Sequence, residues 1–252
     1  MLQITNRCIA IVYLLLCPFN CPGDATSNAS HNTLITAVPA GKFPYLAMNS
    51  VNDPDQSKPN LQQVELSEGI FLVANRNLAD PNFSQTVILL TEYSNTGTCG
   101  LIINRRADLL VTDLFPKQDN MNSLTDKVRM GGPVALNRVQ ILFQAKNTPV
   151  GARHIVENIF LVNSIPLLNQ ISRGDFLPEA LNVYAGYAGW ATGQLETELL
   201  RGDWYLWQAD AATVFKKPAQ EIWPDLIRLV TTQWVDNQSD KRPLFSHTSL
   251  YY

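Results

Sequence analysis

Four polar residues near the ends of predicted strands are the first candidates for chemistry. Asp80 and Asn82 flank a proline in a predicted turn, while Asn104 and Arg105 follow an apolar run. Asp and Asn side chains at turns usually hydrogen-bond the local backbone. Arg105, and Arg138 further along the chain, could pair with acidic residues of the fold or line a ligand site. A structural role and a ligand-binding role both stay open for this set.

A glycine-rich stretch at 184–204, YAGYAGWATGQLETELLRGDW, is the second candidate. Its glycines are spaced G-x-x-G-x-x-x-G and no lysine follows, so it fits neither the dinucleotide fingerprint nor the phosphate loop of NTPases. A helix that begins near Gly193 would still offer free N–H groups to an anion. Alternatively, Gly186 and Gly189 serve only the close approach of a strand and a helix.

Metal-binding and nucleophilic residues are sparse, and we predict neither a metal nor a cofactor. His154 is expected in an exposed loop, and the other two histidines, His31 and His247, lie in predicted tails. Cys99 is the single cysteine of the predicted domain, so a disulfide within the domain is excluded. We expect Cys99 to be half-buried and to act as a small packing residue. The net charge of −3 offers no basic surface, so direct nucleic-acid binding is not expected.

The first 63 residues are predicted to be a leader outside the folded domain. Residues 8–19 form an apolar run that is too short to span a bilayer and resembles the core of a signal peptide, with cleavage after Ala25. Alternatively, translation begins at Met48, and the protein is cytoplasmic rather than exported or envelope-associated. The sequence leaves this choice open, and with it the presence in the mature protein of Cys8, Cys17 and Cys21.

Apolar runs separated by turn residues place these candidates on a mostly β framework. We predict strands at 69–75, 85–93, 99–106, 127–130, 138–144, 158–164, 180–190 and 203–210, and helices at 109–117, 166–174, 193–202 and 223–234. Because strands outnumber helices and the connections are tight, we expect an α+β fold. It is a single compact domain, 64–235, with a mixed, mostly antiparallel, barrel-like sheet, flanking short helices and no membrane span. A flexible tail is expected over 236–252.

Several blocks together resemble the YqgE/AlgH family over about residues 66 to 232. They are GIFLVANRNLADPNFSQTVILLTEYSNTGTCGLIINR, GGPV followed by NRVQILF, and GYAGWATGQLETEL with the following GDW. The resemblance implies a compact α+β domain of unestablished activity, and the AlgH name implies a role in regulating transcription of an exopolysaccharide pathway. The family pattern falls on Asp80 to Phe83, Asn104, Arg105, Gly131 to Pro133, Gly186 to Trp190 and Gly193 to Glu196.

The chain departs from the family pattern at two places. A proline commonly follows the Asn-Arg pair, where this chain has Arg106. An acidic or tyrosine-containing strand often precedes the Gly-Gly turn, where this chain has Arg129 and Met130. Neither departure threatens the fold, but both weaken the transfer of a ligand from relatives.

Two classes of function follow. The first is a non-catalytic regulatory or binding protein that acts indirectly on transcription and binds an unknown protein or a small anionic ligand. Its predicted site is Asp80, Asn82, Asn104, Arg105, Arg138, Tyr187, Trp190, Gly193 and Gln194. The alternative is a hydrolase-type enzyme that uses Asp80 or Glu196 with Arg105, which requires a carboxylate within hydrogen-bond reach of the guanidinium. Glu196 and Glu198, two residues apart on a predicted helix, do not face each other as an acid–base pair.

Overall fold

The computed structural model describes residues 64–114, 127–162 and 164–239. Its strands are β1 Ile70–Ala74, β2 Val87–Ser94, β3 Gly97–Ile102, β4 Arg106–Leu110, β5 Lys127–Met130, β6 Val134–Gln144, β7 Ala152–Val156, β8 Ile159–Val162, β9 Ala180–Trp190 and β10 Trp204–Gln208. Its helices are α2 Val111–Leu114, α4 Ile165–Arg173, α5 Gln194–Arg201, α6 Ala211–Phe215 and α7 Ala219–Ser239. The predicted α+β class is confirmed.

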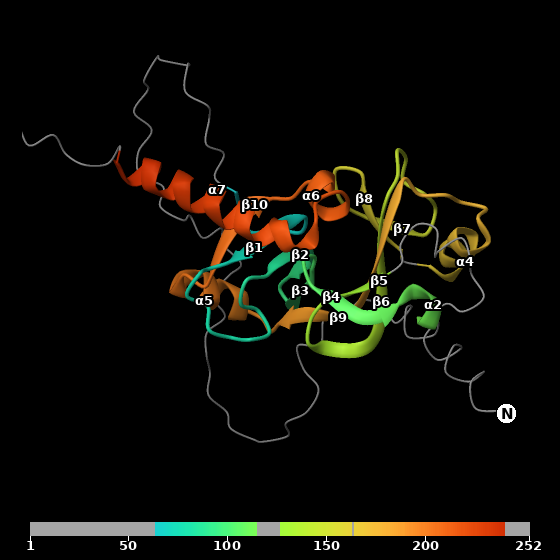
Figure 1. The fold of residues 1–252 in the computed structure, drawn as a ribbon, viewed down its shortest axis with the longest axis horizontal. Coiled ribbons are helices and arrows are strands. Elements are labelled where there is room, and N and C mark those ends of the chain that lie inside the picture. Colours follow the sequence, from blue (N-terminus) through green and yellow to red (C-terminus); the bar gives the residue numbers. More distant parts are fainter. Residues whose placement is uncertain (1–63, 115–126, 163, 240–252) are drawn as a thin grey trace, which may run out of the picture. The chain divides into compact units, whose positions relative to one another are not determined.

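The strands form one curled, half-barrel sheet in the order β10-β1-β2-β3-β9-β6-β8-β7, with β4 and β5 off this path (Figure 1). Neighbours along the path are antiparallel, and β5 runs parallel to β9. Strand β1 is a continuous buried apolar run, as a strand covered on both faces requires. The mixed, mostly antiparallel sheet therefore agrees with the prediction.

Strand β9 links the two halves of the sheet and carries the glycine-rich stretch. Its first half pairs with β6 and its last residues pair with β3. Between them, Gly186 has a φ of 71° and the turn before β6 presses against β9. A Cβ at Gly132 would lie 2.1 Å from the carbonyl carbon of Tyr187, so only glycine permits this approach. The glycines at this crossing therefore serve backbone packing.

Two apolar clusters hold the helices to the sheet. The first joins β1, β2 and β3 to α5, α6 and α7, and the Trp223 indole of α7 donates to the carbonyl of Ala74 at 2.8 Å. The second joins β6 and β8 to α4, which Ser164 caps at its first end and Gly174, with a φ of 79°, caps at its last. Within the described ranges, no helix is long and apolar enough to cross a membrane.

The bounds of α2 and α7 differ from the predicted helices at 109–117 and 223–234. The predicted helix at 109–117 is reduced to α2, because residues 106–110 pair with β5 as β4; residues 115–117 lie outside the described residues. The last helix begins at Ala219 rather than 223, so Pro224 lies inside it and not in the first turn. Ala219 is already buried, but a single alanine gives no apolar period, and the run of large buried side chains begins only at Ile222.

Further differences arise where a strand or helix has little apolar pattern. Strand β6 begins at Val134 rather than 138, and its first four residues are exposed. Strand β7 and helix α6 were not predicted. His154 therefore lies on β7 and not in a loop, although its side chain is exposed as expected. Its Nε2 is 2.7 Å from the carbonyl oxygen of Glu157.

Candidate functional site

Arg105, just after β3, fastens the turn at 80–84, which contains the predicted turn at Asp80, Pro81 and Asn82, to the sheet. Its guanidinium donates, at 2.7 to 3.0 Å, to the carbonyl oxygens of Asn82, Pro81 and Ser84. Inside the turn, the Asp80 carboxylate accepts the N–H of Asn82 at 2.8 Å. The acceptors of Arg105 are backbone groups, so this side chain clamps the turn to the sheet.

Asn104 extends the same clamp to the start of β2. Its Oδ1 accepts the N–H of Val87 at 2.8 Å, and its Nδ2 donates to the carbonyl oxygen of Gln85 at 2.9 Å. Gln85 has a φ of 57°, in the left-handed region that a non-glycine residue adopts only when its surroundings hold it there. Both ends of the Asn104 amide are therefore engaged inside the fold.

The same region does not assemble the carboxylate and guanidinium that a hydrolase would need. Burial lowers the pKa of Arg105, and the charge of Asp80 opposes that shift. Among the described residues, however, the ion pairs do not include one between Arg105 and Asp80 or Glu196. The Glu196 carboxylate instead accepts the hydroxyl of Tyr93 at 2.7 Å. The geometry gives the hydrolase hypothesis no support.

Three rings, which we call the aromatic cluster, join the 80–84 turn to the glycine-rich stretch. The ring of Phe83 stacks on Trp190 at 6.2 Å between centroids and meets Trp204 edge-on at 5.9 Å. The two indoles meet edge-on at 6.1 Å. Both tryptophans are 4% exposed. Offset and edge-to-face ring pairs of this kind contribute about 0.5–1.5 kcal/mol beyond their buried area.

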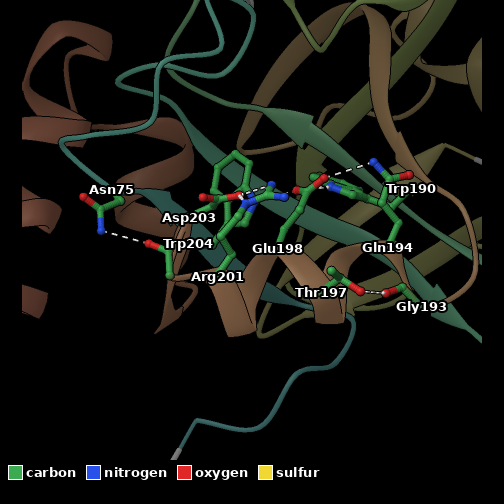
Figure 2. A network of polar contacts seen from close by, with 10 residues as sticks. Asn75, Trp190, Gly193, Gln194, Thr197, Glu198, Arg201, Asp203 and Trp204 are labelled. Atoms are coloured by element: carbon green, nitrogen blue, oxygen red, sulfur yellow. Dashed lines mark hydrogen bonds and ion pairs between the residues drawn. The ribbon is translucent and has the colours of Figure 1, made fainter.

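Glu198 on α5 binds both indoles of the aromatic cluster. Its Oε2 accepts the Nε1–H groups of Trp190 and Trp204, each at 2.9 Å, and its Oε1 accepts the side-chain amide of Gln194 at 3.0 Å. Figure 2 shows the carboxylate of Glu198 between these partners. A half-buried carboxylate with three donors is well satisfied, so this is a strong tie between α5, β9 and β10.

Both ends of α5 are fixed by local polar contacts (Figure 2). At the first end, Gly193 caps the helix with a φ of 76°, and its carbonyl oxygen accepts the Thr197 hydroxyl at 2.8 Å. The side-chain oxygen of Gln194 accepts the N–H of Ala191 at 3.1 Å. At the other end, the Asn75 amide donates to the carbonyl oxygen of Gly202 at 2.8 Å. The exposed turn at 191–194 is therefore held in one conformation.

The structure brings the predicted site residues together in two groups. Asp80, Asn82, Asn104 and Arg105 meet in the clamp, and the aromatic cluster connects them to Trp190, Gly193 and Gln194. Arg138 and Tyr187 form a separate pair, with the guanidinium carbon 5.6 Å from the centre of the ring. Arg138 also acts electrostatically on Glu92 of β2.

Sequence reasoning missed Glu198 and Trp204 as members of the site. Glu198 was considered only as half of a carboxylate pair with Glu196, and the two side chains do take different partners. The contact of Glu198 with Trp204 depends on the pairing of β10 with β1. No local sequence pattern predicts that pairing. The clamp residues, in contrast, could be found because turn chemistry is local.

The described residues contain no group of three or more His, Cys, Asp or Glu side chains placed to hold a metal ion. Cys99 is 2% exposed and disulfide-bonded, so the prediction of a half-buried thiol is wrong. Cys99 therefore offers no thiol nucleophile.

A family model described as AlgH-like matches residues 71–235 of the chain. The chain belongs to the AlgH-like family. Curated relatives are found as well: a UPF0301 protein of Nitrosospira multiformis is 34% identical over 174 residues, which is 68% of this chain and 92% of that protein. A UPF0301 protein of Ralstonia nicotianae is 35% identical over 164 residues, covering 64% of this chain and 86% of the relative. The predicted resemblance is confirmed.

Two solved structures have the same fold. A protein of Corynebacterium diphtheriae matches with a TM-score of 0.58 and 25% identity over 67% of this chain and 90% of its own. The AlgH protein from Pseudomonas aeruginosa, solved in solution, matches with a TM-score of 0.54 and 26% identity over 72% of this chain and 98% of its own. The half-barrel sheet is therefore shared with both of these structures.

Proposed function

We propose that this AlgH-like protein is a non-catalytic binding protein that acts indirectly on transcription through a protein partner or a small anionic ligand. The binding surface would be the pair of exposed turns at 79–82 and 191–194, which we call the paired turns. One observation carries the proposal: the aromatic cluster fastens the two turns to each other, with Phe83 stacked on Trp190 at 6.2 Å.

The chemistry around the paired turns supports binding rather than catalysis. The guanidinium of Arg105, the amide of Asn104 and the carboxylate of Glu198 are all engaged in hydrogen bonds within the fold. The paired turns themselves are exposed. Rigid scaffolds that display loop residues are a common design for recognition. Asn104, Arg105 and Trp190 then act by holding the surface, and so does Gln194 through its bonds to Ala191 and Glu198. Asn82 acts by contact.

Affinity capture with substitutions confined to exposed positions tests the proposal. The tagged full chain is recovered from its own cells, and the bound proteins are quantified beside those of the double variant Asn82→Lys with Thr192→Lys. Both positions are exposed, and the Arg105 clamp uses only the backbone of Asn82. The matched control places the same substitutions on the exposed residues Asn147 and Thr148. We expect the first pair to abolish capture and the control to retain it, with equal melting temperatures.

If the Asn82 and Thr192 double variant captures as much protein as the parent chain does, the paired turns are not the binding surface. The proposal also includes a cytoplasmic location with initiation at Met48. N-terminal sequencing of the recovered chain tests this part, because cleavage after Ala25 would indicate export instead.

A further inference from the structure

Strand β6 turns two polar side chains to the same face of the sheet. Arg138 and Gln140 are two residues apart on this strand, and side chains two apart in a strand point the same way. The Arg138 guanidinium lies over the ring of Tyr187. Gln140 is 4% exposed and pairs across the sheet with Tyr184, which is fully buried. A long amide side chain is therefore enclosed beside a cation and two tyrosines.

The amide of Gln140 has unused hydrogen-bonding capacity. Among the described residues, neither its Nε2 nor its Oε1 has a hydrogen-bond partner. Leaving a buried donor or acceptor unpaired costs about 1–3 kcal/mol. Native folds contain few such groups, and each one needs an explanation. Gln140 therefore presents a donor and an acceptor side by side that the fold itself does not use.

Glu92 lies on β2, which β3 and β9 separate from β6 in the sheet, and the charge of Arg138 on β6 acts on it. Its pairing partner across the sheet is Cys99, and Cys99 in turn pairs with Gly189. A Cβ built on Gly189 would lie 3.1 Å from the Tyr187 ring, so these side chains share one face. The Oε2 of Glu92 is buried and, within the described ranges, has no hydrogen-bond partner.

Charges around this face are balanced. Glu68, just before β1, forms an ion pair with Arg153 of β7 at 3.1 Å. The second Arg153 nitrogen donates to the carbonyl oxygen of Thr91, next to Glu92. Burial raises the pKa of Glu68 and of Glu92, and the positive charge of Arg153 opposes both shifts. The charge of Arg138 also opposes the shift of Glu92.

We propose that this face binds a small uncharged molecule whose edge carries a hydrogen-bond donor beside an acceptor, as carboxamides and nucleobases do. We call its residues the interior polar cluster: Glu68, Glu92, Arg138, Gln140 and Tyr187. The inference goes beyond the function proposed above, because it uses none of the paired turns.

The chemical class follows from the groups that are unpaired. A glutamine amide pairs through two parallel hydrogen bonds with an edge that offers one donor and one acceptor, such as that of adenine or of another carboxamide. The Glu92 oxygen adds one more acceptor for a second donor of the ligand. An anion is not favoured, because Arg153 is ion-paired with Glu68 and the carboxylates of Glu68 and Glu92 would repel it.

Calorimetric titration of the full chain at neutral pH tests the proposal with adenine, nicotinamide and inorganic phosphate as probes. We expect adenine or nicotinamide to bind saturably and phosphate not to bind. Gln140→Leu should weaken that binding about tenfold or more, because it removes the paired donor and acceptor. The matched control is Gln208→Leu, the same substitution at an exposed strand position, which should bind as the parent chain does.

A second measurement separates ligand binding from a structural role of Gln140. Without a ligand, Gln140→Leu should melt no lower than the parent chain, because an apolar side chain of similar size replaces an unpaired amide. The proposal is overturned if neither adenine nor nicotinamide binds, or if phosphate alone binds. It is also overturned if Gln140→Leu binds as tightly as the parent chain, or if a crystal grown with both probes shows only ordered water at Gln140.

Discussion

Two polar groups enclosed by this fold behave in opposite ways. Around Glu198, every carboxylate oxygen has a donor, and two buried indoles are held by one side chain. In the interior polar cluster, both amide atoms of Gln140 and one oxygen of Glu92 lack a partner among the described residues. A fully paired network stiffens a fold, whereas a partly paired one costs stability. The difference separates polar residues that build this fold from those available to a ligand.

Removing the Glu198 carboxylate should have the largest effect on stability. Glu198→Ala leaves the indole N–H groups of Trp190 and Trp204 without their acceptor in a nearly buried cluster. We expect the free energy of unfolding to fall by about 3 kcal/mol, since each stranded donor costs about 1–3 kcal/mol. Urea denaturation measures the change.

The control for this substitution lies two residues earlier on the same helix. Glu196→Ala removes one hydrogen bond to the exposed Tyr93 and should cost less than about 1 kcal/mol. Equal losses for the two variants would mean that the aromatic cluster does not depend on Glu198.

Arg105→Ala should have the second largest effect on stability. It tests whether a hydrogen-bonded network also holds the turn at 80–84. The substitution removes three hydrogen bonds to backbone carbonyl oxygens. We expect a loss of about 2 kcal/mol and faster proteolytic cleavage within the turn. Arg106→Ala, at the exposed neighbouring position, is the control and should leave both readouts unchanged. A turn that resists protease equally in both variants would contradict the clamp.

The pH dependence of the melting temperature of Glu92→Gln tests whether Glu92, in the interior polar cluster, is withdrawn from water. Burial raises the pKa of Glu92 in the folded state, so its stabilising contribution is present below its unfolded pKa and is lost as the pH rises through the folded pKa. The parent chain should therefore gain melting temperature relative to Glu92→Gln as the pH falls from about 7 towards 4.5.

The same substitution at the exposed residue Glu179 controls for the loss of one charge. Melting temperatures of the three proteins are compared across the same pH series. A constant difference between the parent chain and Glu92→Gln at every pH would show that Glu92 is not withdrawn from water.

Tyr93→Phe should have the smallest effect, confined to alkaline pH. Burial, together with the hydrogen bond and charge of Glu196, raises the pKa of Tyr93 from 10.0 to about 12. The contribution of Tyr93 to stability is present below pH 10 and lost as the pH rises towards 12. Tyr93→Phe should remove this part of the alkaline decline in melting temperature. If both proteins decline identically above pH 10, the contact between β2 and α5 is not formed in solution.

Much of the fold could be predicted because its signals are local. Apolar runs gave β1, β2, β3 and β9, and glycine at both ends marked α5. Elements with exposed or short apolar patterns, such as β7 and the first part of β6, were missed. Hydrophobic periodicity reports burial, so a strand that is mostly exposed leaves little trace in the sequence.

The candidate site could be predicted only in part for a similar reason. Turn and strand-end residues such as Asp80 and Arg105 stand out by type, and the structure does bring them together. The roles of Glu198 and Gln140 depend on strand order and register, which place Trp204 and Tyr184 beside them. A polar residue inside an apolar run, such as Gln140 before ILF, was the one sequence signal that could have indicated the second group.

The central claim is that Glu198 supports this fold while Gln140 costs it stability. Urea denaturation of Glu198→Ala and Gln140→Leu, side by side with the parent chain at neutral pH, tests it most directly. We predict opposite responses: a loss of about 3 kcal/mol for Glu198→Ala, and no loss or a gain for Gln140→Leu. A loss for Gln140→Leu as large as that for Glu198→Ala would contradict the account.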